Sequence, residues 1–554
     1  MRRRSWPALA SVLVSIGSAA GQVCTPNPSA TAAQIALASG GGAPILTGLG
    51  THTHAITTKS REAQRFFDQG LIMHYAFNHR EAVRAFRHAS ELDPEAPMPY
   101  WGIALSLGPH VNAPMDPDAY APAMAALAKA KSKSANGTAR ERAYLEALSA
   151  RYVDVAPDDR SSLDQAYAEA MRTLARQFPD DMTAQTLMAE AVMCTSPWDY
   201  WLPNGTLRGP VAEGRVALER VLSQDPNNPG ANHLYIHVVE AGPTPEVGIP
   251  AADRLRDLVP VAGHLVHMPA HIYVRVGMYH EASRSNEAAI KADRDYFSTC
   301  GMQGFYPLAY YPHNWHFLWW SSMAEGRGEE SLRAARIAGL NITDDFPEAP
   351  RLRVMIPCAL VRFERWDDVL RLPQPPAVQV FETAMWRYAR GLAHAAKGSV
   401  DSARSELSQL AQIIESEQGQ ALEMPFFYGL SQLKIAHGLL SAAVAIGEGR
   451  TEDGLAHLRT AVKLEDGMAY MEPSYWYYPV RQSLGAALLT ARRYGESEAI
   501  FREDLRRNPN NGWSLAGLAR ALRAQGKTGP ADEVDAWQRT AWIRADVPVG
   551  FGPF

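Results

Sequence analysis

The sequence predicts an all-α fold, a right-handed α-solenoid of stacked helix-turn-helix repeats, and three observations predict it. The 554-residue chain is 46% hydrophobic and 20% charged, so most of its length can bury a core. Small residues and large apolar residues recur along it at two fixed spacings. Prolines close several of these segments, at points where a helix has to end.

The first repeat shows the pattern most fully. Gly70, Ala82 and Ala89 are small, so two antiparallel helices can approach closely there. Phe86 is expected to fill the gap between repeats, and Pro94 to end the second helix. These positions match the tetratricopeptide pattern, which repeats about every 34 residues.

The spacings of this repeat, 12 residues (70 to 82) and 16 residues (70 to 86), recur elsewhere in the chain. The copies are Gly391, Ala403 and Leu407; Gly485, Ser497 and Phe501, closed by Pro509; Ala442, Gly454, Leu458 and Ala461; and Ala270, Ala282 and Ala289. Long connections rich in proline or aromatic residues interrupt the array, at 107–137, 195–210, 296–312 and 371–378. The aromatic content of the first three predicts ordered loops folded over a surface.

The N-terminus has the order of a secretory signal peptide. Three arginines at 2–4 precede an apolar run over 6–16, and small residues follow up to Ala20, where cleavage is expected. The run is about half of the roughly 20 residues that a membrane span needs, and no later stretch is expected to reach spanning length. We therefore expect an exported protein, periplasmic or secreted. The predicted segments are a signal peptide (1–20), a flexible lead-in (21–55), N-terminal repeats (56–190), central histidine-rich repeats (191–345) and C-terminal repeats (346–554).

Five segments carry a resemblance to a known family: 67–95, 232–246 (NHLYIHVVEAGPTPE), 263–282 (GHLVHMPAHIYVRVGMYHEA), 310–320 (YYPHNWHFLWW) and 472–489. On these the chain resembles a family of bacterial exported tetratricopeptide-repeat (TPR) proteins with a histidine-rich central region. The resemblance covers most of residues 55–530. It implies a repeat fold with a shared histidine-bearing middle, and it implies no particular reaction.

The histidines are unevenly distributed, since eight of the 17 lie between residues 233 and 316. His233 and His237 are four residues apart on a predicted helix, and Glu240 follows three residues later, so all three can share one face. Two imidazoles at this spacing can bind one metal ion, and Glu240 can ligate or act as a catalytic base. The candidate metal ligands are His233, His237, His264, His267, His271, His313 and His316.

The next repeat supplies three of these candidates. Pro269 is predicted to begin a helix that carries His271, with His264 and His267 in the loop before it. Stacked repeats place corresponding helices side by side, so His237 and His271 can face each other.

The entrance of a following helix is expected to supply His313 and His316 from a third direction. The favoured ligands are His237, His267, His271 and His313. Histidines with a carboxylate suit a divalent Zn, Cu or Fe ion, and the order of affinities does not choose among them. A hydrogen-bonded histidine network, or an anion site formed by protonated histidines, is the alternative.

The remaining histidines near the N-terminus are assigned separately. His74 and His79 are expected to line the concave surface, which makes His79 a candidate for ligand binding. His88 is placed on a solvated face. His52 and His54 fall in the predicted flexible lead-in, where surface histidines are expected.

A second candidate ligand site lies in the aromatic segment near residue 478. Trp476 and Tyr478 lie close to Arg481, and a planar guanidinium beside aromatic rings can hold a carboxylate ligand. Trp198 and Trp201 are expected to cover such a pocket. Core packing between helices is the alternative for these aromatic residues.

Composition excludes some function classes and leaves two. The net charge of −5 offers no basic excess for a phosphate backbone, so no nucleic-acid partner is expected. The sequence has no phosphate-binding glycine loop and no nucleophile elbow. One remaining function is binding of a protein, peptide or small molecule in the solenoid groove. The other is metal-dependent catalysis inside the solenoid, by a Zn hydrolase or a Cu or Fe oxidoreductase.

Overall fold

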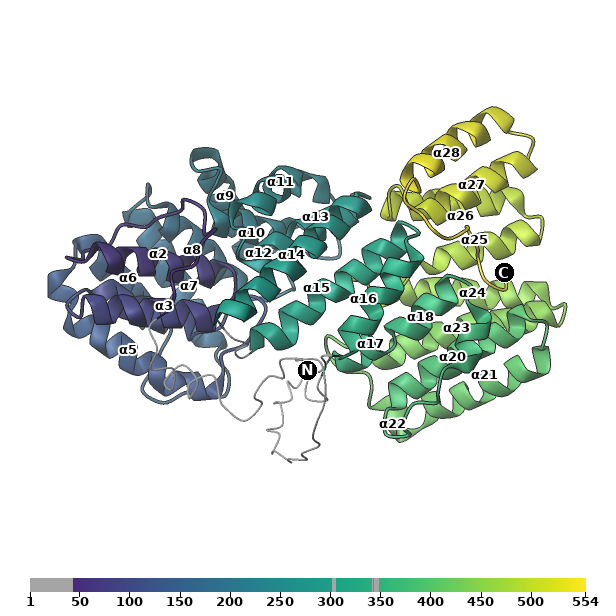
Figure 1. Cartoon of the computed structure of the whole chain (residues 1–554), viewed down its shortest axis with the longest axis horizontal. Coiled ribbons are helices and arrows are strands. Elements are labelled where there is room, and N and C mark those ends of the chain that lie inside the picture. Colours follow the sequence, from purple (N-terminus) through teal and green to yellow (C-terminus); the bar gives the residue numbers. More distant parts are fainter. Residues whose placement is uncertain (1–42, 301–304, 341, 343–347) are drawn as a thin grey trace.

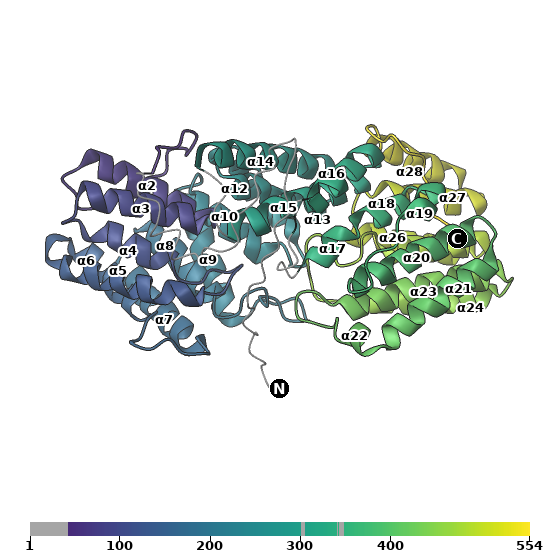
Figure 2. The same ribbon diagram turned by 60° about the horizontal axis from the view of Figure 1, so that its bottom comes forward.

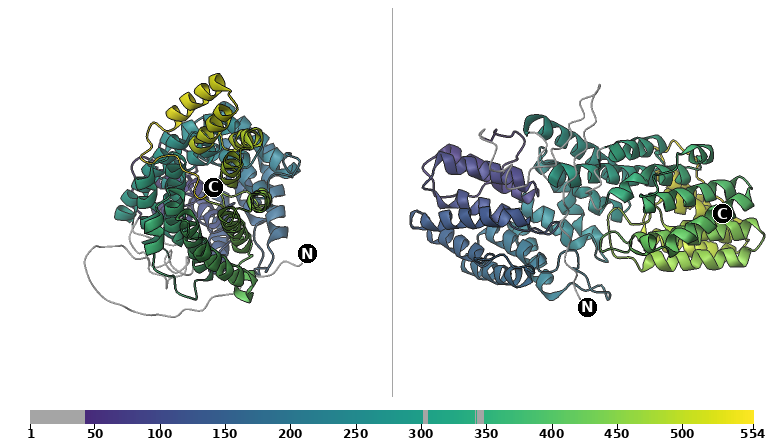
Figure 3. Two further views of the ribbon diagram at one scale, coloured as in Figure 1. Left: turned by 90° about the vertical axis from the view of Figure 1, so that its right-hand side faces the viewer. Right: turned by 90° about the horizontal axis from the view of Figure 1, so that it is seen from below.

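The computed structural model describes residues 43–300, 305–340, 342 and 348–554. Within these ranges the chain is helical and has no strand, only two isolated bridges, His110–Ala113 and Trp201–Leu207. Successive antiparallel helix pairs wind around a common axis, as the end-on view in Figure 3 shows. The predicted all-α solenoid of helix-turn-helix repeats is confirmed.

The half of the solenoid before residue 301 contains thirteen helices and three short 3₁₀ turns in the described residues. They are α2 (Arg61–Tyr75), α3 (His79–Leu92), α4 (Pro97–Ser106), η1 (Pro117–Ala119), α5 (Tyr120–Ser132), η2 (Ser134–Asn136), α6 (Ala139–Ser149), α7 (Ser161–Gln177), α8 (Met182–Met193), α9 (Gly209–Gln224), α10 (Pro229–Val239), η3 (Pro245–Gly248), α11 (Ile249–Leu258), α12 (Gly263–His267), α13 (Pro269–Arg275) and α14 (Tyr279–Cys300).

The remaining helices connect to and build the second half. They are α15 (Phe305–Ala324), α16 (Gly328–Leu340), α17 (Ala349–Arg353), α18 (Met355–Arg362), α19 (Trp366–Arg371), α20 (Val380–Ala396), α21 (Val400–Glu415), α22 (Glu417–Gln420), α23 (Gly429–Gly447), α24 (Thr451–Asp466), α25 (Val480–Thr490), α26 (Tyr494–Arg507), α27 (Gly512–Ala524) and α28 (Thr528–Ala541). In Figure 1 α15 and α16 lie between the two halves, and Figure 2 shows α14 and α16 along one edge of the molecule.

The repeat pattern works through close contact between glycines and large rings. The buried Phe86 ring of α3 lies between Gly70 of α2 and Gly102 of α4, and a Cβ added at either glycine would be 2.6 Å from the ring. Phe501 of α26 packs in the same way against Gly485 of α25. The spacing of 16 residues therefore marks the point where a ring of one helix fills the gap left by a glycine of its neighbour.

Two of the predicted long loops are wrong over most of their length. The segment 107–137 contains η1, α5 and η2, and 296–312 is mostly taken up by the end of α14 and the start of α15. Pro122 and Pro307 lie in the first turns of α5 and α15, where a helix needs no backbone N–H, so these prolines do not mark loops. The other two connections are non-helical nearly throughout, at 195–208 and 372–379.

The predicted flexible lead-in is wrong for its described part, residues 43–55. The backbone N–H of Leu46 donates to Gln69 Oε1 (3.0 Å), and that of His54 donates to Asp68 Oδ1 (2.9 Å). Leu46 and His54 are buried. Polar side chains of α2 thus pair with the backbone of this segment and hold it against the helix. Residues 1–42, with the predicted signal peptide, lie outside the described residues.

Helix α23 is the one helix of the described chain that is long and apolar enough to cross a membrane. It has 19 residues, its apolar window has a mean hydropathy of 1.3, and 72% of that window is buried inside the protein. Leu433, Leu439 and Leu440 are fully buried. The expectation that no later stretch reaches spanning length is therefore wrong, while the burial is typical of the core helix of a repeat array.

Candidate metal centre

The first two candidate ligands lie on α10. Pro229 occupies its first turn, and the Asn228 side chain caps it by accepting a hydrogen bond from the Ala231 N–H (2.9 Å). His233 and His237, one helical turn apart, project from the same face and are 0% and 2% exposed. The two histidines thus lie on one helix, as their four-residue spacing predicts.

The third ligand comes from α12, which faces α10. The sequence placed His264 and His267 in a loop, and this is wrong, because both lie on this short helix. Gly263 begins it, and a Cβ there would collide with the Asp293 carboxylate of α14, so only glycine allows α12 to pack this closely. The His264 backbone N–H also donates to the Tyr306 hydroxyl (2.9 Å).

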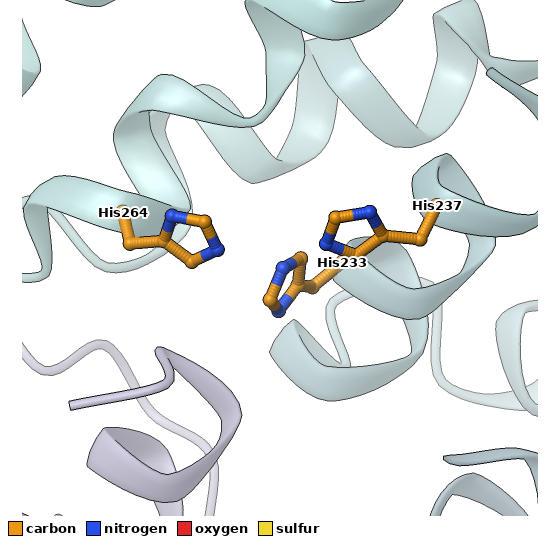
Figure 4. A group of neighbouring side chains, drawn as sticks. All are labelled: His233, His237 and His264. Atoms are coloured by element: carbon orange, nitrogen blue, oxygen red, sulfur yellow. The ribbon is translucent and has the colours of Figure 1, made fainter. Parts of the chain in front are cut away.

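These helices bring three imidazoles together in what we call the first set, His233, His237 and His264 (Figure 4). One ring nitrogen of each lies within 4.8 Å of the other two. The Nε2 atoms of His233 and His237 and both ring nitrogens of His264 are buried and have no hydrogen-bond partner among the described residues. A buried polar atom left in this state costs about 1–3 kcal/mol, and a bound cation would remove that cost.

A second set consists of His267, His271 and His313, whose ligand atoms also lie within 4.8 Å of one another. The Nε2 atoms of His267 and His271 are only 2.8 Å apart. His313 is partly exposed and lies in the third turn of α15, not at a helix entrance. The expected helix entrance is wrong, because α15 already begins at Phe305 and continues through Pro312.

The Glu240 carboxylate joins the two sets. Its Oε1 accepts a hydrogen bond from His237 Nδ1 (2.8 Å), and its Oε2 accepts one from His271 Nδ1 (2.5 Å). Because the carboxylate only accepts, both imidazoles carry their proton on Nδ1 when neutral. Each then presents an Nε2 lone pair away from Glu240, and the carboxylate fixes the orientation of one histidine from each set.

Two more histidines have their tautomer fixed in the same way. His233 Nδ1 donates to the backbone carbonyl of Tyr75 (2.6 Å) at the end of α2. His267 Nδ1 donates to Asn286 Oδ1 (2.7 Å), and the Asn286 amide donates to the Ala282 carbonyl (2.8 Å), which sets the orientation of the amide. In both imidazoles the Nε2 lone pair remains available to a ligand.

Sequence reasoning missed one carboxylate of the centre, Glu472. The connection between α24 and α25 brings its Oε2 to 3.1 Å from His271 Nδ1, and Glu240, His271 and Glu472 form a third group of ligand atoms within 4.8 Å. The guanidinium of Arg275 lies 5.2 Å from the Tyr470 ring and helps to hold this connection in place. The only signal in the sequence was that Glu472 flanks the aromatic segment.

Burial and charge divide the titratable groups of the centre into two kinds. Burial lowers the pKa of four histidines well below the usual value, so that their imidazoles are neutral: His233, His264, His267 and His313. Burial acts to lower the pKa of His271 as well, but the charges of Glu240 and Glu472 outweigh it and raise that pKa. Burial acts to raise the pKa of Glu240, and the neighbouring histidines lower it instead.

Two aromatic residues with left-handed backbones pack on the first set. Phe77 (φ 55°) has its ring centroid 4.5 Å from that of His233 and 5.3 Å from that of His264. Trp198 (φ 63°) approaches His237 edge-on at 5.7 Å. A non-glycine residue in this conformation costs about 1–2 kcal/mol, and such strain gathers at functional sites. The predicted covering loop thus lies over the histidines and not over Arg481.

His79, the candidate ligand-binding histidine of the first repeat, lies beside the centre. Its ring stacks on His74 (4.7 Å between centroids) and lies 4.5 Å from that of His110. His74 Nε2 is 3.3 Å from a Glu190 carboxylate oxygen. The His79 ring contacts Phe77 edge-on, with 6.3 Å between centroids. The Phe77 ring thus lies between His79 and the first set.

His316 is not brought into either set. Its ring stacks on Trp319 (5.5 Å), and it lines a small cavity of about 20 Å³ together with Trp476. Although it lies only one turn after His313 on α15, it is turned toward the C-terminal half of the solenoid.

The structure does not support the proposed carboxylate site at Arg481. Both guanidinium nitrogens NH1 and NH2 donate to the Asp466 carboxylate, at 2.8 and 2.6 Å. The Tyr478 hydroxyl bonds the Ser483 hydroxyl (2.8 Å), and Trp476 is buried. Arg481 already holds a carboxylate of its own chain, so the core-packing interpretation of this segment fits the contacts better.

His52 and His54 line a polar surface cavity of about 380 Å³, with Asp181 and Asp225 on its other walls. Burial lowers the pKa of His54 to about 4. These two histidines are therefore packed residues and not the surface histidines expected of a flexible segment.

No protein-family model and no curated protein matches the chain. Among solved structures it is similar to the human IFIT1 dimer with m7Gppp-AAAA (11% identity, covering 88% of this chain and 91% of that one, TM-score 0.31). It is also similar to yeast Tom70 (11%, 88% and 91%, TM-score 0.27) and to the P58(IPK) TPR domain (13%, 84% and 99%, TM-score 0.22). At these TM-scores the chains do not superpose as wholes, so the architecture rests on the helix pairs described above.

Proposed function

We propose that this protein binds a transition-metal ion inside its solenoid, with His233, His237 and His264 as ligands. One observation carries the proposal: three buried imidazoles from two helices converge, and four of their ring nitrogens have no hydrogen-bond partner among the described residues. Neutral imidazoles suit Zn, Cu or Fe. Hydrogen bonds to Tyr75 and Glu240 orient two of the three rings toward such an ion.

Metal-dependent catalysis remains the alternative within this proposal. An ion held by three histidines would keep a fourth coordination position open. At that position it would activate a bound water molecule or react with O₂. The role first assigned to Glu240, a catalytic base, fits its contacts poorly, because each carboxylate oxygen already accepts from a histidine. Glu240 is better placed to position ligands.

Export, membership of the bacterial TPR family and a partner in the groove belong to the same proposal. Their support is the residue order at the N-terminus, the five resembling segments and the repeat fold, whose stacked helices form extended binding surfaces in many proteins. A protein, peptide or small molecule is the expected partner, with no nucleic acid.

The test is elemental analysis of the full chain, purified without a histidine tag, before and after treatment with a chelator. We expect Zn, Cu or Fe in stoichiometric amount, lost on chelation and regained on adding the metal. His264→Phe, which keeps the size of the ring, should remove the ion, because a site that loses one of three ligands binds far more weakly.

His88→Ala is the matched control. His88 of α3 belongs to neither histidine set, since it pairs with Glu91 (3.0 Å) and packs edge-on against Phe66 (4.4 Å), so this variant should keep its metal. Wild-type protein that binds none of the three metals would reject the proposal.

A further inference from the structure

We propose that the cluster holds two ions, the second between His267, His271 and His313, and that Glu240 orients one ligand of each ion. This inference rests on the proposed function, since it assigns a second site beside the first. It starts from the hydrogen bonds of the second set.

The two Nε2 atoms of His267 and His271 face each other at 2.8 Å. His267 uses its Nδ1 proton to bond Asn286, and His271 uses its Nδ1 proton to bond Glu240. Both Nε2 atoms therefore present lone pairs to each other, and a pair of acceptors this close requires a cation between them. Without metal that cation is a shared proton with one positive charge, and a divalent ion that displaces this proton to solvent supplies two.

Little movement would be needed to replace the proton. With Zn–N distances of about 2.0–2.1 Å, two nitrogens of a tetrahedral site are about 3.3 Å apart, roughly 0.5 Å more than the present separation. His313 closes the group as the third ligand within 4.8 Å.

The two sets share no histidine, so one ion does not account for both. The connection between them is Glu240, whose Oε1 accepts from His237 of the first set and whose Oε2 accepts from His271 of the second. A carboxylate bonded to the far nitrogen of a metal-ligating histidine fixes the ring and strengthens it as a ligand. One buried carboxylate does this for both sets.

Charge favours a second cation as well. Glu240 and Glu472 are 1% and 5% exposed, and both lie within 3.1 Å of His271 Nδ1. Both carboxylates face the one N–H that His271 carries on Nδ1, and the other Glu472 oxygen, Oε1, has no hydrogen-bond partner among the described residues. Two buried carboxylates are costly unless cations balance them, and a divalent ion on the Nε2 side of His271 supplies that balance.

The experiment counts ions on the full chain after its metal has been stripped with a chelator. In a Zn²⁺ titration followed by calorimetry, and by zinc content after gel filtration, the wild type should bind two equivalents. His264→Phe and His313→Ala should each bind one, the double variant none, and His88→Ala two. Circular dichroism and a thermal melt of each variant confirm that it is folded.

A titration of the wild type with Co²⁺ gives the same count without any substitution. Its visible ligand-field absorption should grow until two equivalents are bound. If the wild type binds no ion, the proposed function fails. If it binds one ion that His264→Phe abolishes and His313→Ala leaves in place, the second site is rejected while the proposed function stands. If it binds one ion that only His313→Ala abolishes, the proposed first site is rejected.

Glu240→Gln tests the shared orienting role. The amide has one carbonyl oxygen, so it can accept from one imidazole, while its NH₂ faces the other and opposes that tautomer. We expect at least one of the two ions to bind about 10–100-fold more weakly. Unchanged affinity at both sites would overturn this part of the proposal.

Discussion

The two histidine sets and the aromatic segment around Arg481 contain the same kinds of residue that binding sites use, and they differ in how their polar atoms are satisfied. Arg481 is paired through two hydrogen bonds with Asp466, and Tyr478 bonds Ser483. In the first histidine set, by contrast, the Nδ1 atom of His233 is satisfied while its Nε2 atom faces other unpartnered nitrogens. Residue type suggests a candidate site, and several unsatisfied buried nitrogens that converge on one point distinguish the histidine set from a core region with a single such atom.

The difference extends to the residues behind each region. In the first set, the hydrogen bonds that Nδ1 of His233 and of His237 donate to Tyr75 and Glu240 leave the opposite nitrogens, Nε2, without a partner among the described residues. Around Arg481 the guanidinium and the Tyr478 hydroxyl bond within the segment, and the buried Trp476 Nε1 is a single donor without a partner in the described part of the chain, where the first histidine set has four such nitrogens.

The largest effect concerns pH and Asp293, which holds the histidine region together. Asp293 is 1% exposed and accepts hydrogen bonds from the Tyr306 hydroxyl (2.9 Å) and the Asn314 amide (2.8 Å), which links α14 to α15. Burial raises its pKa to about 7. A raised pKa in the folded state means that the stabilisation is present below the unfolded pKa of about 4 and is lost as pH rises through 7.

We therefore expect the chelated wild type to lose roughly 2–3 kcal/mol of unfolding free energy from this group between pH 5 and pH 8. In Asp293→Asn the difference in unfolding free energy between pH 5 and pH 8, measured by urea unfolding, should be smaller by this amount. Asp180→Asn is the control, because the Asp180 side chain is 93% exposed. The same slope in wild type and Asp293→Asn would show that the carboxyl is not held protonated.

Much of the fold could be predicted from the sequence, because the relevant contacts are local and periodic. The 16-residue spacing from Gly70 to Phe86 encodes a contact inside one helix pair, and it repeats from Gly485 to Phe501. The loop predictions failed where proline was taken as a helix breaker, since its effect depends on its position within the helix, as Pro122 shows.

The candidate site could be predicted only in part, because some of its contacts join parts of the chain that are distant in sequence. The pair His233 and His237 is visible as a four-residue spacing on one helix. Glu472 is not, because its approach to His271 depends on how two distant parts of the chain pack. The hydrogen bond from His233 to the Tyr75 carbonyl is also invisible, since any residue at that position would offer the same backbone atom.

The second prediction concerns Asn286, which positions a ligand of the second set without touching the ion. Asn286→Leu removes the acceptor for His267 Nδ1, so the imidazole is free to rotate and to change tautomer. We expect the second Zn²⁺ to bind about 10–100-fold more weakly in calorimetry, with the first unaffected. Asn286→Asp keeps an acceptor and should retain most of the affinity. An equal loss in both variants would mean that Asn286 matters for packing and not for the acceptor.

The smallest effect is expected at Arg481, the centre of the aromatic segment. Arg481→Gln removes the paired hydrogen bonds to Asp466, whose side chain is 31% exposed, so we expect a loss of only about 1 kcal/mol in unfolding free energy. A double-mutant cycle with Asp466→Asn should assign most of that loss to the pair. Metal content should stay at the wild-type value, and acetate or succinate should raise the melting temperature of neither protein. If a carboxylate stabilises the wild type and not Arg481→Gln, the guanidinium exchanges Asp466 for a ligand. The aromatic segment would then be a binding site after all, and satisfied hydrogen bonds would no longer distinguish it from the histidine sets.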